Sequence, residues 1–205
     1  TLAYQAIDYL KEHPSVIPAN VKVTIIPLMN PDGLFKVAST SGRVTSRDVP
    51  KLLADTVIGR FNARNVDLNR NFDCDWQTTG KWQSRTVSGG NAVFSEPESQ
   101  AVKNYIEAHK PTAVVVYFSA AGGVYASNCH NGIPAETRVI MKVYGDASGY
   151  PADDNFDFYA TTGSMANWLA KNNVPAISVL LTNHTSTEWD KNQKGLDALL
   201  KHYTK

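Results

Sequence analysis

Three short apolar runs, each bounded by polar or turn-forming residues, set the strongest limit on how this chain can fold. They cover residues 21–29 (VKVTIIPLM), 113–118 (AVVVYF) and 174–181 (VPAISVLL). Runs of this length, rich in β-branched residues, are typical of strands buried in a sheet. Helix-like segments alternate with them, at 1–12, 95–108, 135–144, 163–172 and 190–203. Strands that alternate with helices predict an α/β layered domain.

Turn and capping residues mark where some of these elements are expected to begin. Residues 30–33 (NPDG) are predicted to form a turn, because proline presets φ and glycine permits a positive φ. Ser95 is expected to cap the helix that follows it, with Glu98 completing a capping box. Residues 34–93 are rich in Gly, Ser, Thr, Asn and Arg, which predicts a long irregular stretch. Such a stretch inside a compact domain is usually functional.

Length and charge limit the class of protein further. The chain has 205 residues, 42% of them hydrophobic, which is enough for one domain over residues 1–205 with a sizeable core. The net charge of +1 gives no reason to expect a nucleic-acid or anionic-membrane partner. No window of 18 apolar residues and no signal peptide is present, so no membrane span is expected. The chain begins directly in a helix-like stretch, which suggests that upstream sequence is missing.

The two cysteines, Cys74 and Cys129, lie in polar, loop-like stretches. They could form one disulfide, which would indicate an oxidising compartment. They could instead be two unrelated free thiols. The Trp, Asn and Gly residues around both cysteines favour the disulfide slightly.

Three motifs, in order along the chain, resemble those of the zinc carboxypeptidase family, particularly its bacterial-type members. They are residues 25–33 (IIPLMNPDG), 66–72 (VDLNRNF) and 94–98 (FSEPE). The similarity continues to the C-terminus. The resemblance implies a twisted, mixed β-sheet flanked by helices on both faces, truncated at its N-terminus. It also suggests an extracytoplasmic origin for the parent type.

The second motif carries the residues suited to binding a free carboxylate. Arginine offers paired donors in a planar fork, and asparagine adds a neutral donor. In the family an Asn-Arg pair at this place binds the substrate's terminal carboxylate, which corresponds to Asn69 and Arg70. The alternative is that Asp67 and Arg70 form a structural salt bridge while Asn71 caps a turn.

Other site residues follow from the resemblance alone. Arg60 occupies the place of the arginine that stabilises the oxyanion, ahead of Arg43 and Arg47 as candidates. Tyr159 corresponds to the tyrosine that closes over bound substrate, or else is an aromatic residue packed beside its neighbours. Residues 165–166 (MA) would lie near an uncharged pocket for the terminal side chain.

The residues for zinc and for proton transfer are missing. A catalytic zinc needs three protein ligands and an open position, but none of the five histidines begins a His-x-x-Glu pair. The third ligand position of the family holds Phe118, and the general-base position holds Leu180. Neither side chain can bind a metal or accept a proton. We therefore expect no zinc and no other cofactor.

Three functions remain open at this point. The preferred one is an inactive pseudoenzyme or engineered derivative that binds peptides with a free C-terminus. The abrupt start of the chain favours the engineered origin. The second is a zinc carboxypeptidase completed by a missing N-terminal fragment, and the third is a structural scaffold without a ligand. In the family the missing segment supplies a strand between residues 21–29 and 113–118, so either these two pair directly or an open edge favours self-association.

Overall fold

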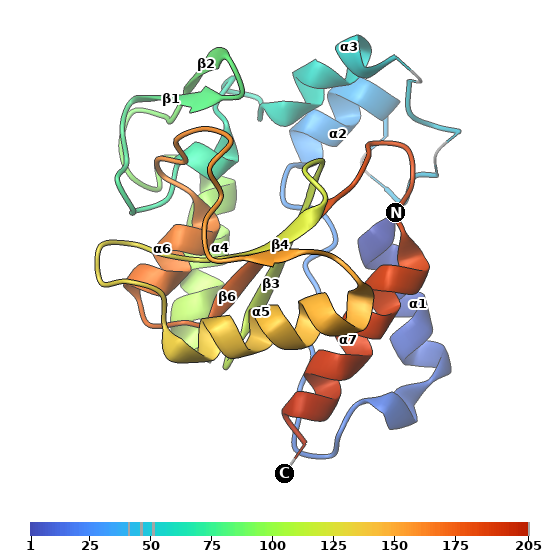
Figure 1. Cartoon of the computed structure of the whole chain (residues 1–205). Coiled ribbons are helices and arrows are strands. Elements are labelled where there is room, and N and C mark those ends of the chain that lie inside the picture. The colour runs from blue at the N-terminus through green and yellow to red at the C-terminus, as the bar shows by residue number, and fades with distance from the viewer. Residues whose placement is uncertain (41, 46, 51, 205) are drawn as a thin grey trace.

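The computed structural model describes residues 1–40, 42–45, 47–50 and 52–204 (Figure 1). Its helices are α1 (Leu2–Glu12), α2 (Pro31–Ala38), α3 (Leu53–Thr56), α4 (Pro97–His109), α5 (Ala135–Ser148), α6 (Met165–Lys171) and α7 (Trp189–His202). Its strands are β1 (Thr79–Trp82), β2 (Arg85–Ser88), β3 (Val114–Ser119), β4 (Gly123–Ala126), β5 (Ala152–Asp153) and β6 (Ala176–Leu181). Short 3₁₀ turns cover Pro14–Val16, Val57–Arg60 and Leu68–Arg70.

The central sheet has four strands in the order β3-β6-β4-β5. β3 and β6 run parallel, β4 is antiparallel to β6, and β5 is parallel to β4. Strands β1 and β2 form a separate antiparallel hairpin. The sheet is therefore mixed, as the sequence motifs predict.

Apolar clusters on the two faces of the sheet attach its helices. One cluster joins Ile177 and Val179 of β6 to residues of α5 and α7, including Tyr144 and Leu199. The other joins the opposite face of the sheet to α4 and α6, with Trp168 at its centre. Because neighbouring side chains along a strand point to opposite faces, the central strands β3 and β6 each contribute to both clusters. This confirms the prediction of helices on both faces.

The prediction of a strand over residues 21–29 is wrong. The segment is extended, and its side chains alternate between half-buried Val21, Val23 and Ile25 and exposed Lys22 and Thr24, but it forms no ladder. A strand requires a neighbour that shares its backbone hydrogen bonds. Within the described part of the chain, no segment pairs with residues 21–29, and β3 pairs only with β6. The two segments therefore do not pair directly, and β3 is an open edge.

Two local predictions also need correction. Residues 30–33 are not an isolated turn but the start of α2, because the Asn30 side chain accepts a hydrogen bond from the Gly33 amide at 2.9 Å. Asparagine is a favoured N-cap residue, and a proline follows at the first helical position. The stretch 34–93 is therefore not irregular throughout, because it contains most of α2, all of α3 and the β1–β2 hairpin. The predicted capping box of α4 is absent, because the helix begins after Glu96 and Ser95 donates its hydroxyl to the Glu96 carboxylate instead.

The helices are too short or too polar for a bilayer. Among the described residues, none of them could cross a membrane. The longest, α5 and α7, have 14 residues each.

Candidate carboxylate-binding site

The turn that presents Asn69 and Arg70 is organised by one buried carboxylate. Asp67 is 1% exposed, and its Oδ1 accepts a hydrogen bond from the Asn69 amide at 3.0 Å. Its Oδ2 accepts from Nε and Nη2 of Arg60, at 2.9 and 2.8 Å. The structural salt bridge considered for Asp67 is therefore made by Arg60 and not by Arg70.

Arg70 is a buried cation held by backbone carbonyl groups. It is 1% exposed. Its Nε and Nη2 donate to the carbonyl of Lys81 at 3.0 and 2.6 Å, and its Nη1 donates to the carbonyl of Asn69 at 2.6 Å. Burial lowers the pKa of the Arg70 guanidinium; the nearby Asp67 carboxylate opposes this shift, and the positive charge of Arg60 adds to it. Arginine nevertheless stays charged in proteins.

The donor inventory of Arg70 leaves room for an anion. A guanidinium has five N–H groups. Three of them are used by the carbonyls of Asn69 and Lys81, and the Tyr159 side chain is a further hydrogen-bond partner of the guanidinium. Two N–H groups are therefore available to an anion only when Tyr159 moves aside. Within the described ranges, no carboxylate lies at ion-pair distance from Arg70. With Tyr159 displaced, the remaining N–H groups of the guanidinium can donate to a carboxylate.

Asn69 is oriented so that it can add a donor. Its Oδ1 accepts a hydrogen bond from the Met165 amide at the start of α6, at 3.0 Å. Ser164 caps this helix by accepting a hydrogen bond from the Asn167 amide. Because the oxygen is engaged, the amide nitrogen of Asn69 is left as the outward group, and it has no partner among the described residues. Asn69 is half-buried, so a ligand can reach this nitrogen.

Tyr159 covers Arg70. The centre of its ring lies 5.8 Å from the guanidinium carbon, within the range of a cation–π contact. The same ring packs edge-on against Phe156 at 5.1 Å, and Phe156 packs against Tyr125 at 5.3 Å. Tyr159 is thus both a neighbour of Arg70 and part of an aromatic cluster.

Two glycines make room for Arg70. A Cβ atom at Gly80 would lie 2.9 Å from Cδ of Arg70, and one at Gly163 would lie 2.2 Å from its carbonyl oxygen. Gly163 also has a φ of +63°. Its carbonyl accepts from the Phe72 amide at 3.0 Å, and its amide donates to the Cys74 carbonyl at 2.6 Å. Together with Lys81, these positions belong to the site but were not identified from the sequence.

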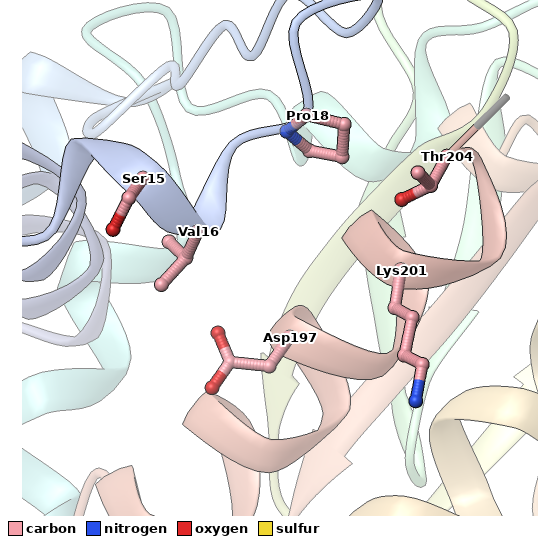
Figure 2. A pocket seen from close by; sticks show the side chains of 6 residues that line it. All are labelled: Ser15, Val16, Pro18, Asp197, Lys201 and Thr204. Carbon is pink, nitrogen blue, oxygen red and sulfur yellow. The ribbon is translucent and has the colours of Figure 1, made fainter.

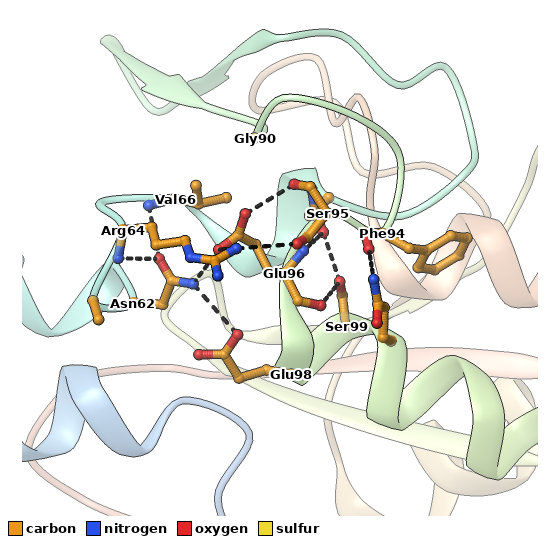
Figure 3. A network of polar contacts seen from close by, with 12 residues as sticks. Asn62, Arg64, Val66, Gly90, Phe94, Ser95, Glu96, Glu98 and Ser99 are labelled. Carbon is orange, nitrogen blue, oxygen red and sulfur yellow. Dashed lines mark hydrogen bonds and ion pairs between the residues drawn. The ribbon is translucent and has the colours of Figure 1, made fainter.

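A buried polar network fixes the chain on either side of the Asn69–Arg70 turn (Figure 3). Asn62 donates to the Glu96 carboxylate at 2.7 Å. The Oδ1 atom of Asn71 accepts from the Glu96 amide at 3.2 Å and from the Ser99 hydroxyl at 2.6 Å. Cys74 and Cys129 are joined by a disulfide, with their Cα atoms 6.1 Å apart. The turn is therefore anchored to α4 and to the segment after β4.

The arginine candidates for an oxyanion contact differ in their surroundings. Arg60 lies 5.1 Å from the Trp82 ring centre, and Asp67 occupies two of its nitrogens. Arg43 instead pairs with Asp8 of α1. Arg47 is exposed. Of the three, Arg60 alone is linked to the Asn69–Arg70 turn, through Asp67.

The positions expected for zinc chemistry are apolar neighbours. Phe118 of β3 and Leu180 of β6 are register partners, and Gly123 of β4 is the partner of Leu180 on its other side. Leu180 is 7% exposed. Next to Phe118, the Ser119 hydroxyl lies 2.9 Å from Nδ1 of His184. Neither apolar side chain has a lone pair for a metal, so the residues present do not fit the family's zinc.

A separate hollow of about 300 Å³ lies between the first 3₁₀ turn and the end of α7 (Figure 2). It is lined by Ser15, Val16, Pro18, Asp197, Lys201 and Thr204. Asp197 is engaged by the Tyr9 hydroxyl at 2.9 Å. Figure 1 shows this end of α7 at the opposite side of the molecule from the β1–β2 hairpin, so the hollow is not part of the Arg70 site.

Known proteins with similar sequences are carboxypeptidases. The family model described as zinc carboxypeptidase matches residues 2–193. Carboxypeptidase O of Bos taurus is 27% identical over 172 residues, which cover 76% of this chain and 44% of that protein. The catalytic chain of carboxypeptidase N from Rattus norvegicus is 33% identical over 113 residues, or 55% of this chain and 22% of that protein. The chain therefore spans less than half the length of these relatives.

Solved structures share the fold at lower identity. Bovine thrombin-activatable fibrinolysis inhibitor, in complex with tick carboxypeptidase inhibitor, gives a TM-score of 0.69 at 15% identity and covers 98% of this chain and 74% of that one. Murein-tripeptide amidase MpaA from Escherichia coli O157 gives a TM-score of 0.57 at 23% identity, covering 86% and 67%. With the three motifs and the match over residues 2–193, these findings show that the chain belongs to the zinc carboxypeptidase family.

Proposed function

We propose that this chain is a non-catalytic member of the family that binds the free C-terminal carboxylate of peptides at Arg70. One observation carries the proposal. Arg70 is a buried cation whose hydrogen-bond partners are two carbonyl groups and the Tyr159 side chain, and no carboxylate of the described residues lies at ion-pair distance from it. A buried charge is normally paired, because desolvating an unpaired one is costly. A carboxylate ligand would supply the missing pairing, and the amide nitrogen of Asn69 would add a hydrogen bond.

The residues at the zinc and base positions support the absence of catalysis. Phe118 and Leu180 are adjacent apolar side chains where hydrolysis would need a metal ligand and a proton acceptor. Apolar residues there remove the cost of burying unsatisfied polar groups. The alternative, a carboxypeptidase completed by another fragment, would have to work without these two groups.

The expected affinity is low. A charge-assisted, paired contact contributes about 1.5–3 kcal/mol, whereas a Kd of 1 mM requires about 4.1 kcal/mol. A pocket for the terminal side chain, which the resemblance implies near residues 165–166, would have to provide the rest; Met165 itself is 8% exposed and packs in the core cluster with Trp168. Because Arg70 is only 1% exposed, Tyr159 must also move aside when the ligand enters. We therefore expect millimolar binding of short peptides.

Chemical-shift titration tests this function. Wild type should respond to an N-blocked dipeptide acid and much less to the corresponding dipeptide amide. Arg70→Lys keeps the charge but loses the fork, so the preference for the acid should disappear. Arg138→Lys is the matched control, because the Arg138 side chain on α5 is 53% exposed and pairs with Asp154, away from Arg70. Asn69→Ala should weaken binding of the acid.

The same experiment separates the alternatives. Equal responses to acid and amide, or no response to either, would remove the binding function and leave a scaffold. If Arg70 is only structural, Arg70→Lys should lower stability without changing any ligand response. One equivalent of zinc retained by the oxidised protein after dialysis, together with hydrolysis of the dipeptide, would establish the completed carboxypeptidase instead.

A further inference from the structure

The disulfide lies in a corner that contains two more metal-binding side chains. Asp75 follows Cys74, and His130 follows Cys129. The ligand atoms of Cys74, Asp75 and Cys129 all lie within 4.8 Å of one another. Nε2 of His130 lies 2.7 Å from Oδ1 of Asp75. Two sulfurs, an imidazole and a carboxylate therefore meet at one place.

The backbone brings these side chains together. Asp75 and His130 both have a φ of +51°, in the left-handed region that non-glycine residues rarely adopt. This conformation turns the chain immediately after each cysteine, and the two following side chains contact each other. The sulfurs are buried, with Cys74 and Cys129 at 2% and 3% exposure. The Asp75 and His130 side chains are 52% and 70% exposed, so an ion can enter from solvent.

The donor set suits zinc once the sulfurs are thiolates. Zinc in proteins takes four ligands from thiolate, imidazole and carboxylate groups in a tetrahedral arrangement. Two sulfurs at a Zn–S distance of about 2.3 Å are separated by roughly 3.8 Å in that geometry. The Cα atoms of Cys74 and Cys129 lie 6.1 Å apart, so small side-chain rotations suffice for this separation.

We propose that reduction of the Cys74–Cys129 disulfide converts this corner into a zinc site with Cys74, Cys129, His130 and Asp75 as ligands. A dithiol reductant gives two electrons and two protons to the disulfide and is itself oxidised to a disulfide. Zinc then displaces the two thiol protons, because the metal binds thiolates. In the oxidised state the sulfurs are bonded to each other and the site is closed to metal.

The proposal is independent of peptide binding. None of the four ligands contacts the guanidinium of Arg70, and the family's third zinc-ligand position at Phe118 and general-base position at Leu180 are not involved. In both redox states residue 74 remains tied to residue 129, first by the S–S bond and then by the metal. The corner would thus exchange one crosslink for another when the redox conditions change.

Cobalt titration tests the site. The protein reduced with a phosphine should bind one equivalent of Co²⁺ with a sulfur-to-cobalt charge-transfer band and the visible bands of tetrahedral cobalt, and Zn²⁺ should remove both signals. Oxidised protein should show neither. His130→Ala and Asp75→Asn should each weaken binding by about tenfold or more. His184→Ala, which changes a histidine outside the corner, should leave binding unchanged.

The controls make the result decisive. The Cys74→Ser/Cys129→Ser double variant should lose the charge-transfer band; if it does not fold, the oxidised wild type is the metal-free reference. Zinc should also protect both thiols of the reduced wild type from alkylation. Absence of binding after reduction, or binding that the His130 and Asp75 variants retain unchanged, would overturn the proposal.

Discussion

Leu180→Glu tests whether residue 180, which corresponds by resemblance to the family's general base, lies in an apolar environment. Leu180 is 7% exposed, and its cross-strand neighbours are Phe118 and Gly123. Removing a buried leucine side chain forfeits about 1.5–3 kcal/mol of burial. The new carboxyl group has no partner among these neighbours, so its pKa in the folded state should rise above the ordinary value of about 4.3.

The sign of the pH dependence follows from that rise. Below the unfolded-state pKa the glutamate is neutral in both states, and only the burial loss remains. As the pH rises from the unfolded-state pKa to the folded-state pKa, the unfolded state ionises first and stability falls. Each unit of pKa elevation removes about 1.4 kcal/mol, and the loss is constant above the folded-state pKa.

Urea denaturation at pH 4 and pH 7, followed by circular dichroism, measures this difference. The quantity to compare is the stability of each variant relative to wild type at the same pH, which cancels the pH dependence of other groups. Leu180→Gln is the control, because it introduces an uncharged polar group at the same place and its deficit should not change with pH. An equal deficit for Leu180→Glu at both pH values would refute the reasoning, and a smaller deficit at pH 7 would show that a cation lies within reach.

Further predictions concern the turn, the glycine beside Arg70 and the sheet edge. Arg60→Ala should lower the free energy of unfolding by about 3 kcal/mol, because it leaves the buried Asp67 carboxylate without its cation; Arg60→Ala/Asp67→Asn should recover part of this in the same denaturation assay. Gly163→Ala should destabilise the protein by more than the roughly 1–2 kcal/mol of an unfavourable φ, because the new Cβ would also clash with a carbonyl 2.2 Å away. Gly132→Ala, with a φ of +81° and nothing within 4 Å, should show the backbone cost alone. We propose that two copies pair through the open edge of β3, so light scattering should detect a dimer that Tyr117→Lys weakens; a monomer at all concentrations would contradict this.

The sequence predicts those parts of the fold whose periodicity agrees with their surroundings. The helices at both ends and the parallel strands β3 and β6 match the predicted segments to within a few residues. Residues 21–29 have an equally strong strand pattern but no ladder, because pairing depends on a neighbour and not on the segment itself. The sequence Asn-Pro-Asp-Gly is compatible with an isolated turn and with the N-terminus of a helix, so it does not by itself predict the N-cap of α2.

The candidate site also has residues that the sequence identifies and residues that it does not. The Asn69–Arg70 pair can be identified because side chains of that type in that motif are distinctive. The contact of Arg70 with the Lys81 carbonyl cannot, because any residue supplies a carbonyl group. The pairing of Arg60 with Asp67 cannot be predicted either, because spacing along the chain does not show which of two nearby arginines reaches the carboxylate. Gly80 and Gly163 were the available signals, because glycine often marks a close approach of backbone to another group.

The disulfide has a consequence for the unfolded chain as well. Cys74 and Cys129 are separated by 55 positions, so the oxidised chain is a closed ring with two tails even when no structure is present. In a chain-entropy model a ring of this size stabilises the folded state by about 4 kcal/mol. The ring also shortens the covalent path between Cys74 and Gly163, whose backbone groups meet in the folded protein. Reduction should therefore slow the search that brings the Tyr159 segment back to Arg70, while the helices, which depend on local contacts, form at their usual rate.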